Sequence, residues 1–192
     1  FSALESGGWV GRNGYTGEAG FEIICPPDQA EAWWSKCCEA GALPCGLAAR
    51  DTLRTEMGFC LYGHELDEST SPLEAGLGWA VHLDGGDFIG KEAMMAQVRG
   101  GLKRRLVGIK MLERGIPRPG YELILPQDDD RERLVIGSLT SGTYSPSLEC
   151  GIGLGMVQSD CCANGTKLAI DMRGRLKKAE IVALPFIPMN VR

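Results

Sequence analysis

The feature that most constrains the fold is a series of six short alternating segments that begins after residue 102. Apolar and polar residues alternate along the segments with the period of a half-buried β-strand, and glycine or proline clusters separate them. They read RRLVGIKML, YELILP, RLVIGSLTSG, CGIGLGMV, TKLAIDM and KKAEIVALPF. Short strands at such spacings are typical of a small sandwich or barrel, which closes on itself and hides its edges.

The first part of the chain is of a different kind. We predict a helix in DQAEAWWSKCCEAG, in which Asp28 is a typical N-cap residue and Gly41 a typical stop. A second helix is predicted in LAARDTLRTEMG, one strand at residues 78–83, and a short helix in DFIGKEAMMAQVRGG. We therefore predict a mixed α/β part over residues 1–86 and a second part over residues 87–192.

Composition favours a globular protein and argues against several functional classes. Hydrophobic residues make up 44% of the chain, and no apolar run approaches the roughly 20 residues of a membrane helix. The net charge of −5 argues against nucleic-acid binding, which depends on clustered Lys and Arg. The 8 cysteines form no C-x-x-C pair and only 2 histidines are present. We predict no metal site, and free thiols, mostly buried, in a reducing compartment.

Glycines recur every three residues in GRNGYTGEAGFEI, residues 11–23. A dinucleotide-binding loop would need G-x-G-x-x-G spacing and a helix directly after it. Here the chain instead runs into the short strand pattern FEIIC, which Pro26 and Pro27 end. The stretch therefore predicts a turn that delivers Glu22, which stands on the strand.

Three other charged or glycine-rich motifs receive plain structural interpretations. GGDFIGKE at residues 85–92 matches a nucleotide-binding loop only in part, because Glu92 stands where Ser or Thr must hold magnesium. His64 is interpreted as a solvated turn histidine. The charge run at residues 128–133 is interpreted as a solvated hairpin tip.

Glu22 and Arg50 are the candidate binding residues. Ordinary surface charges are the alternative, since isolated charged residues are usually solvated. Glu22, however, follows a loop whose glycines allow close approach of other backbone, and Arg50 shares one helical stripe with Leu47, Arg54 and Met57. A carboxylate accepts from paired N–H groups and an arginine donates in a fork. Such a pair would suit a ligand with an amide-like edge and a carboxylate or carbonyl.

Ordered segments along essentially the whole chain resemble the aminomethyltransferase family, the T-protein of the glycine cleavage system. They are GRNGYTGEAGFEI, GLAARDTLRTEMGFCLYGHELDE, SPLEAGLGWAVHLDGGDFIGKEA, RGIPRPGYEL, IGSLTSGTYSPSL and GTKLAIDMRG. The chain is similar to the C-terminal half of that family. The resemblance implies an α+β fold, with a partial ferredoxin-like α/β part over residues 1–86 and an antiparallel β-barrel over residues 87–192.

The resemblance also implies an activity. The family transfers an aminomethyl group from the lipoyl arm of H-protein to tetrahydrofolate, which gives 5,10-methylenetetrahydrofolate and ammonia. The second Glu of its G-Y-T-G-E-x-G-x-E-I motif and the Arg of A-A-R-D bind folate, and they match Glu22 and Arg50. The family's acid–base aspartate lies in its N-terminal part, so we assign no catalytic residue to this chain. Val191 stands where mitochondrial-type members carry a substrate-contacting tyrosine.

Two alternatives from other classes stay open. One is a folate-binding module without transferase activity, of the kind fused to oxidases of methylated glycines or found in folate-dependent proteins acting on RNA. The other is an inert fragment whose α/β part exposes apolar surface and associates with itself. The resemblance implies a mitochondrial matrix location in a eukaryote and a cytoplasmic one otherwise.

Overall fold

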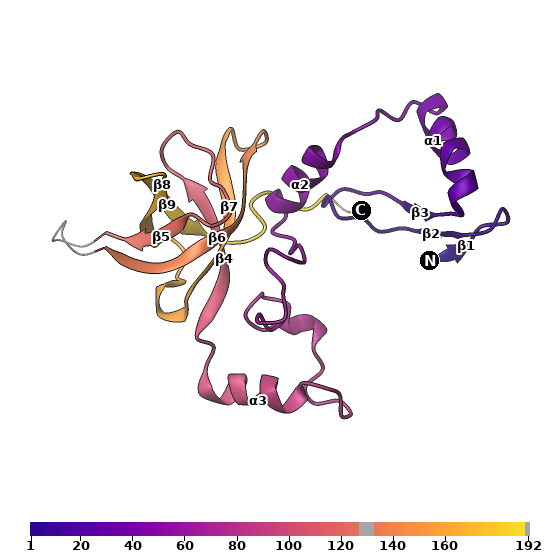
Figure 1. Ribbon diagram of the computed structural model, residues 1–192. Coiled ribbons are helices and arrows are strands. Elements are labelled where there is room, and N and C mark those ends of the chain that lie inside the picture. Colours follow the sequence, from indigo (N-terminus) through magenta and orange to yellow (C-terminus); the bar gives the residue numbers. More distant parts are fainter. Residues whose placement is uncertain (127–132, 191–192) are drawn as a thin grey trace.

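A closed antiparallel barrel forms one side of the molecule in the computed structural model, which describes residues 1–126 and 133–190 (Figure 1). The six predicted segments are its six strands, in the order β4-β7-β6-β5-β8-β9. The predicted fold class, α+β with a C-terminal barrel, is confirmed. The strands are β4 Arg104–Met111, β5 Glu122–Leu125, β6 Leu134–Ser145, β7 Cys150–Gln158, β8 Lys167–Met172 and β9 Arg175–Val182.

Alternating glycines make β7 narrow on the inside of the barrel. A Cβ atom at Gly153 would lie 2.6 Å from the Ser141 carbonyl oxygen, and one at Gly155 would lie 2.8 Å from the Leu123 side chain. The space is needed by the core, whose fully buried members include Ile109, Leu123, Ile170 and Ile181. Strand β7 can therefore serve two surfaces, because glycine faces the core and larger residues face outward.

A small sheet and two helices make up the α/β part. Strands β1 Ser2–Ala3, β2 Trp9–Gly11 and β3 Glu22–Ile24 pair antiparallel. A short 3₁₀ helix, η1 Pro27–Gln29, leads into α1 Ala30–Glu39. The N-cap prediction for Asp28 is wrong, because Asp28 lies inside η1 and no side chain caps either helix. Gly41 follows the helix with a φ of 98°, as expected of a stop residue.

The stretch of residues 47–100, which leads from the small sheet to the barrel, departs from prediction at one point. Helices α2 Leu47–Glu56 and α3 Lys91–Gly100 form where expected. The strand predicted at residues 78–83 is wrong, because a 3₁₀ helix, η2 Gly78–Ala80, occupies it. Its backbone bonds are local, from Ala80 to Leu77 and from Val81 to Gly78. A strand needs a neighbouring strand to satisfy its backbone groups, and none pairs with this segment in the described structure.

The cysteines are free, but their predicted burial is wrong. Cys37 and Cys45 are exposed, and the other six thiols are partly exposed. A third short 3₁₀ helix, η3 Ser159–Cys161, contains one of them. No helix in the described part of the chain is both long and apolar enough to cross a membrane. The predicted charge run lies largely, and Val191 entirely, outside the described residues.

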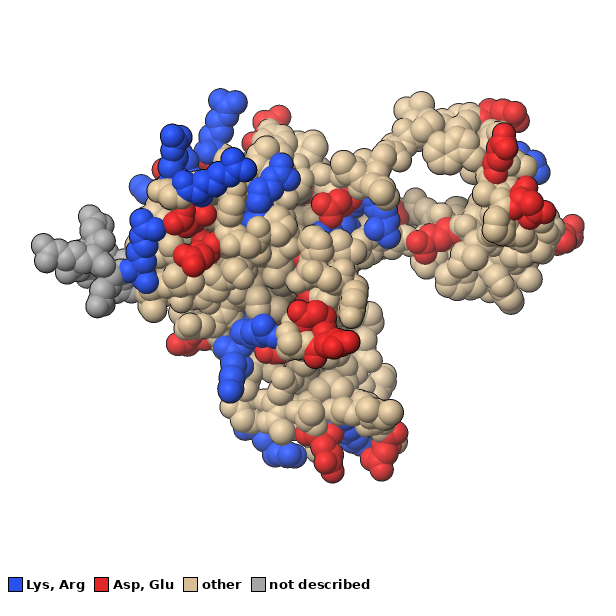
Figure 2. Space-filling model, viewed as in Figure 1, with Lys and Arg blue, Asp and Glu red and all other residues tan. Residues whose placement is uncertain are grey.

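Charge is distributed unevenly over the molecule. Figure 2 shows lysine and arginine side chains gathered over the barrel, while acidic side chains dominate the arm that holds the small sheet and α1. The sequence has the same asymmetry, with acidic residues in excess before residue 86 and basic residues after it. The net charge of the whole chain therefore hides two parts of opposite sign.

Candidate functional site

Helix α2 lies on the outer face of the barrel, where three hydroxyl groups of β6 contact it. Ser141, Thr143 and Ser145 stand at alternate positions of β6 and so share one face of the strand. Ser141 Oγ lies 2.7 Å from Arg54 Nη2, Thr143 Oγ1 lies 3.0 Å from Thr52 Oγ1, and Ser145 Oγ donates to Glu56. These hydroxyl contacts fix which face of α2 meets the barrel.

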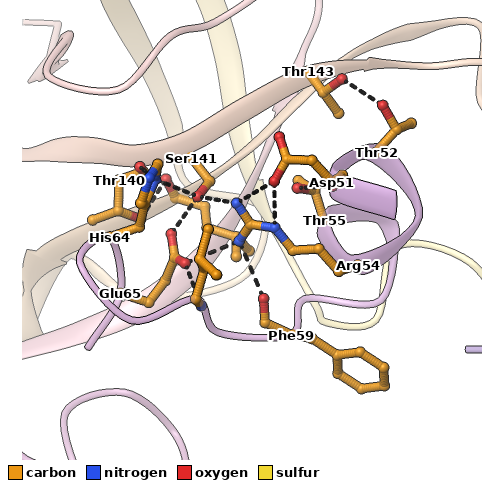
Figure 3. Close-up of polar contacts among 12 residues, drawn as sticks. Asp51, Thr52, Arg54, Thr55, Phe59, His64, Glu65, Thr140, Ser141 and Thr143 are labelled. Atoms are coloured by element: carbon orange, nitrogen blue, oxygen red, sulfur yellow. Dashed lines mark hydrogen bonds and ion pairs between the residues drawn. The ribbon is translucent and has the colours of Figure 1, made fainter. Parts of the chain in front are cut away.

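Arg54 is the centre of this interface, with only 1% of its surface exposed (Figure 3). Its Nε donates to Asp51 Oδ1 at 2.8 Å, and its Nη2 lies 2.7 Å from the same oxygen. Its Nη1 donates to the Phe59 carbonyl at 3.2 Å and to Glu65 Oε2 at 2.9 Å. Together with Ser141, these partners accept four hydrogen bonds from the guanidinium, which can donate five.

Glu65 and Ser141 complete a closed triangle with Arg54. Ser141 Oγ donates to Glu65 Oε1 at 2.6 Å, and the Leu61 N–H donates to Glu65 Oε2 at 2.9 Å. Glu65 and Ser141 are each 1% exposed. The buried charges of Arg54 and Glu65 are thus paired and hydrogen-bonded, which is the condition under which proteins keep buried charges.

His64 is exposed, as predicted. Its Nδ1 lies 3.0 Å from the Thr140 carbonyl and 3.4 Å from Ser141 Oγ. Ser141 is not available as a nucleophile for this histidine, since its hydroxyl proton is given to Glu65. The cluster of Arg54, Glu65 and Ser141 therefore connects α2, the loop after it and β6, and it does not form a nucleophile–base pair.

The glycine loop of residues 11–20 docks against the C-terminal end of α2. Gly17 has a φ of 76° and contacts the Met57 side chain so closely that a Cβ atom there would overlap it. The Tyr15 hydroxyl donates to the Cys60 carbonyl. Near the C-terminus, the Asn190 N–H donates to the Gly17 carbonyl at 2.9 Å, and Asn190 Nδ2 donates to Glu18 Oε2 at 2.9 Å. The loop is thus held by three separate segments.

Arg50 lies on the exposed side of α2, over the face of the Tyr15 ring. The distance from its Cζ to the ring centroid is 4.4 Å, within the range of a cation–π contact. Tyr15 in turn stacks on Phe59, with ring centroids 5.7 Å apart. Among the described residues the Arg50 side chain makes no hydrogen bond or ion pair, so its N–H fork is open to a ligand.

Glu22 lies on β3, opposite Gly11 in the ladder, and is exposed. No hydrogen bond or ion pair joins Glu22 to Arg50 within the described structure. The structure therefore places the two predicted residues on separate elements, β3 and α2, and does not pair them. Their assignment as ligand-binding residues stays a prediction.

Two hollows flank the stacked rings of Tyr15 and Phe59. One, of about 620 Å³, is mainly apolar and is lined by residues of five segments, including Cys60, Leu77, Trp79 and Leu106. The other, of about 410 Å³, lies between the glycine loop and Met189. Both volumes fall in the range of small-molecule sites. Glu22 and Arg50 line neither hollow, whereas Tyr15 lines the larger one.

Two titrating groups beside the larger hollow are kept neutral. Burial raises the pKa of Tyr15, with the Arg54 charge acting against it. Burial, together with the Glu65 charge, raises the pKa of the Cys60 thiol to about 11. No group of three or more His, Cys, Asp or Glu side chains that could hold a metal occurs in the described part of the chain. The site therefore has the chemistry of binding and orientation, with a neutral aromatic wall and an exposed cation.

Two family models match this chain. Residues 5–85 match the GCVT N-terminal domain, and residues 104–187 match the glycine cleavage T-protein C-terminal barrel domain. The second match spans the closed barrel described above. The chain belongs to the glycine cleavage T-protein family. The boundary predicted near residue 86 stays a prediction.

Curated relatives carry the name aminomethyltransferase. The aminomethyltransferase of Bacteroides thetaiotaomicron is 49% identical over 182 residues, which are 92% of this chain and 49% of that protein. That of Nostoc is 43% identical over 186 residues, 96% of this chain and 48% of the relative. The chain thus spans about half the length of the curated relatives it matches. These relatives are bacterial. The predicted location, the mitochondrial matrix in a eukaryote and the cytoplasm otherwise, stays a prediction.

A solved structure agrees in fold. The glycine cleavage system aminomethyltransferase T from Bartonella henselae superposes with a TM-score of 0.88 at 33% identity, over 98% of this chain and 52% of that chain. The comparison supports the α+β arrangement of barrel, helix and small sheet. It leaves the roles of individual residues to be argued from this chain.

Sequence reasoning missed Tyr15, Arg54 and Ser141 as parts of the site. Tyr15, which lies between Gly14 and Gly17, was a usable signal, because a large aromatic side chain in a glycine loop is expected to pack against another part of the protein. Arg54 carried no such signal. Its stripe predicted that it points the same way as Arg50, whereas the structure buries one and exposes the other.

Proposed function

We propose that this chain supplies the folate-holding part of an aminomethyltransferase. The reaction transfers an aminomethyl group from the lipoyl arm of H-protein to tetrahydrofolate, and releases ammonia and 5,10-methylenetetrahydrofolate. One observation carries the proposal: the Arg50 guanidinium lies with its N–H donors uncommitted on the ring of Tyr15, a residue that lines an apolar hollow of about 620 Å³. Membership of the T-protein family supports it.

The residues present fit a folate. A pterin is a flat ring with N–H donors on one edge, and an exposed carboxylate such as Glu22 accepts from paired donors. Arg50 donates in a fork to a carboxylate or carbonyl. Apolar and aromatic side chains line the larger hollow and suit a ring system. Glu22 and Arg50 thus bind and orient the co-substrate, and we assign proton transfer to neither of them.

Orientation is the main contribution we assign to these residues. Holding the folate nitrogen against the aminomethyl carbon replaces a bimolecular encounter, which is worth roughly 7–11 kcal/mol when the geometry is good. Lipoylated H-protein is the proposed donor and the partner.

Calorimetric titration of the chain with tetrahydrofolate tests the proposal. We expect micromolar binding that weakens at least tenfold in Arg50→Ala and in Glu22→Ala. Arg99→Ala is the matched control, because Arg99 is an exposed arginine on α3. Unchanged affinity in Arg50→Ala and Glu22→Ala would show that these residues do not hold folate. No binding to a folded chain would contradict a folate site formed by these residues.

A further inference from the structure

Arg54 and Arg50 stand one turn apart on α2 and have opposite environments. Arg50 is exposed and has an open fork, whereas Arg54 is 1% exposed and donates four hydrogen bonds to four partners. Those partners belong to α2, to the loop that follows it, and to β6 of the barrel. Arg54 is thus the point at which three segments are held together.

Two routes connect this point to Arg50. The first is the helix itself, because Arg54 fixes α2 against β6 one turn after Arg50. The second passes through the loop: Arg54 Nη1 holds the Phe59 carbonyl at 3.2 Å, the Tyr15 hydroxyl donates to the adjacent Cys60 carbonyl, and the Tyr15 ring lies under Arg50. Arg54 therefore determines the positions of both the helix that carries Arg50 and the Tyr15 ring on which Arg50 lies.

Stability alone is a weak explanation for such a cluster. A buried ion pair loses much of its attraction to desolvation, and apolar residues of similar size often replace one without cost. A guanidinium with five fixed donors instead defines direction, since its planar fork accepts partners only at set angles. A lysine has three donors on a flexible stem and cannot hold the same four partners.

We propose that Arg54, locked by Glu65 and Ser141, is a positioning residue that sets the orientation of the Arg50 guanidinium on the Tyr15 ring. The consequence for folate affinity rests on the proposed function, whereas the orientation of Arg50 does not. Loss of the cluster lets α2 and the Tyr15 loop shift relative to each other. Arg50 then leaves the ring while the barrel stays folded.

Nuclear magnetic resonance of the full chain tests the orientation directly, without a ligand. Protons stacked on an aromatic face are shifted upfield, so the Arg50 side-chain signals report its contact with Tyr15. We expect Ser141→Ala to reduce this upfield shift by half or more. Thr143→Val is the matched control, because it removes one hydroxyl contact between β6 and α2 without touching Arg54. It should leave the Arg50 signals in place.

A second variant and a second readout separate positioning from folding. Glu65→Gln keeps the size of the side chain and removes its charge, and we expect the same loss of shift. Tetrahydrofolate affinity should fall about tenfold in Ser141→Ala and less than twofold in Thr143→Val. Arg54→Lys should fail to restore either readout, although it keeps the charge.

Each outcome decides one of two questions. Unchanged Arg50 signals in Ser141→Ala and Glu65→Gln would overturn the positioning role, whatever the folate result. Unfolding of both variants would also overturn it, because the cluster would then serve the stability of the whole fold. Suppose that the Arg50 signals shift in Ser141→Ala and Glu65→Gln, while folate affinity is unchanged in these variants and in Arg50→Ala. This result would leave the positioning role intact and overturn the proposed function.

Discussion

Two glycines of the loop differ in whether the structure requires a glycine at their position. Gly17 combines a positive φ with close contact to Met57. Gly20 has an ordinary φ, and a Cβ atom added there would lie 4.0 Å from the nearest atom, the Glu18 carbonyl oxygen. The even spacing of the glycines in the sequence hides this difference. Only the docking of the loop on α2 makes Gly17 necessary.

Gly17→Ala should therefore destabilise the chain, by about 1–3 kcal/mol, because the new methyl group overlaps Met57 and the backbone is left-handed. Gly20→Ala is the matched control and should change the free energy of unfolding by less than about 0.5 kcal/mol. Urea denaturation of both variants measures the difference. Equal stability of the two would show that the loop does not pack on α2 as described.

The reactivity of the thiols is a second prediction at this scale. The pKa of Cys60 is raised to about 11 by burial, so roughly one thiol in a thousand is ionised at pH 8. Cys37 and Cys45 are exposed. Iodoacetamide at pH 8 should modify these two first and Cys60 last, as read by mass spectrometry of the peptides. Early labelling of Cys60 would contradict the partial burial of its thiol.

At the scale of elements, Glu74 ties the turn before η2 to the first strand of the barrel. Its carboxylate accepts from the Ser71 N–H at 3.0 Å and from Arg104 Nε at 2.9 Å, and its carbonyl accepts from the Leu106 N–H at 2.9 Å. Burial works to raise the pKa of Glu74, but the bonds from Ser71 and Arg104 outweigh it and lower the pKa below its ordinary 4.5.

This lowered pKa predicts a pH dependence with a definite sign. A carboxyl whose pKa is lower in the folded state stabilises above its unfolded pKa, and the contribution is lost as the pH falls through the folded value. Glu74→Gln should therefore be less stable than the parent chain at pH 7, with a difference that shrinks below about pH 4. Urea midpoints between pH 7 and pH 3 measure this, with the exposed Glu68→Gln as control. A constant difference would contradict it.

At the scale of the whole molecule, the barrel and the small sheet differ in how well they are covered. The barrel has a continuous buried core, whereas no apolar side chain among residues 1–50 is buried. Ile23 and Ile24 point to opposite faces of β3, and both are exposed, at 38% and 57%. Neither face of the small sheet is therefore covered in this chain.

The isolated chain should consequently bind the dye ANS and associate with itself as its concentration rises. Trp34 is 59% exposed on α1 and Leu176 is 46% exposed on the barrel. Trp34→Ser should lower dye fluorescence markedly, and Leu176→Ser only slightly. Sedimentation velocity measures the association. A monodisperse chain without dye binding would show that the small sheet is covered in solution.

The sequence alone determined the barrel strands and the three helices. These follow from periodicity and from turn residues, which act between near neighbours in the chain. The sequence also named Glu22 and Arg50 as candidate binding residues, and that role stays a prediction. The order of the strands, the 3₁₀ helix at Gly78–Ala80 and the exposure of the cysteines were decided only by tertiary structure.

The division between Arg50 and Arg54 shows the physical reason. Both stand on one helical stripe, and local spacing treats them alike. Contacts separated by 87 residues in sequence, from Ser141 on β6, bury Arg54 in a network and leave Arg50 free on Tyr15. A sequence pattern specifies which face of a helix is buried or exposed on average. What a given side chain meets there depends on segments that only folding brings together.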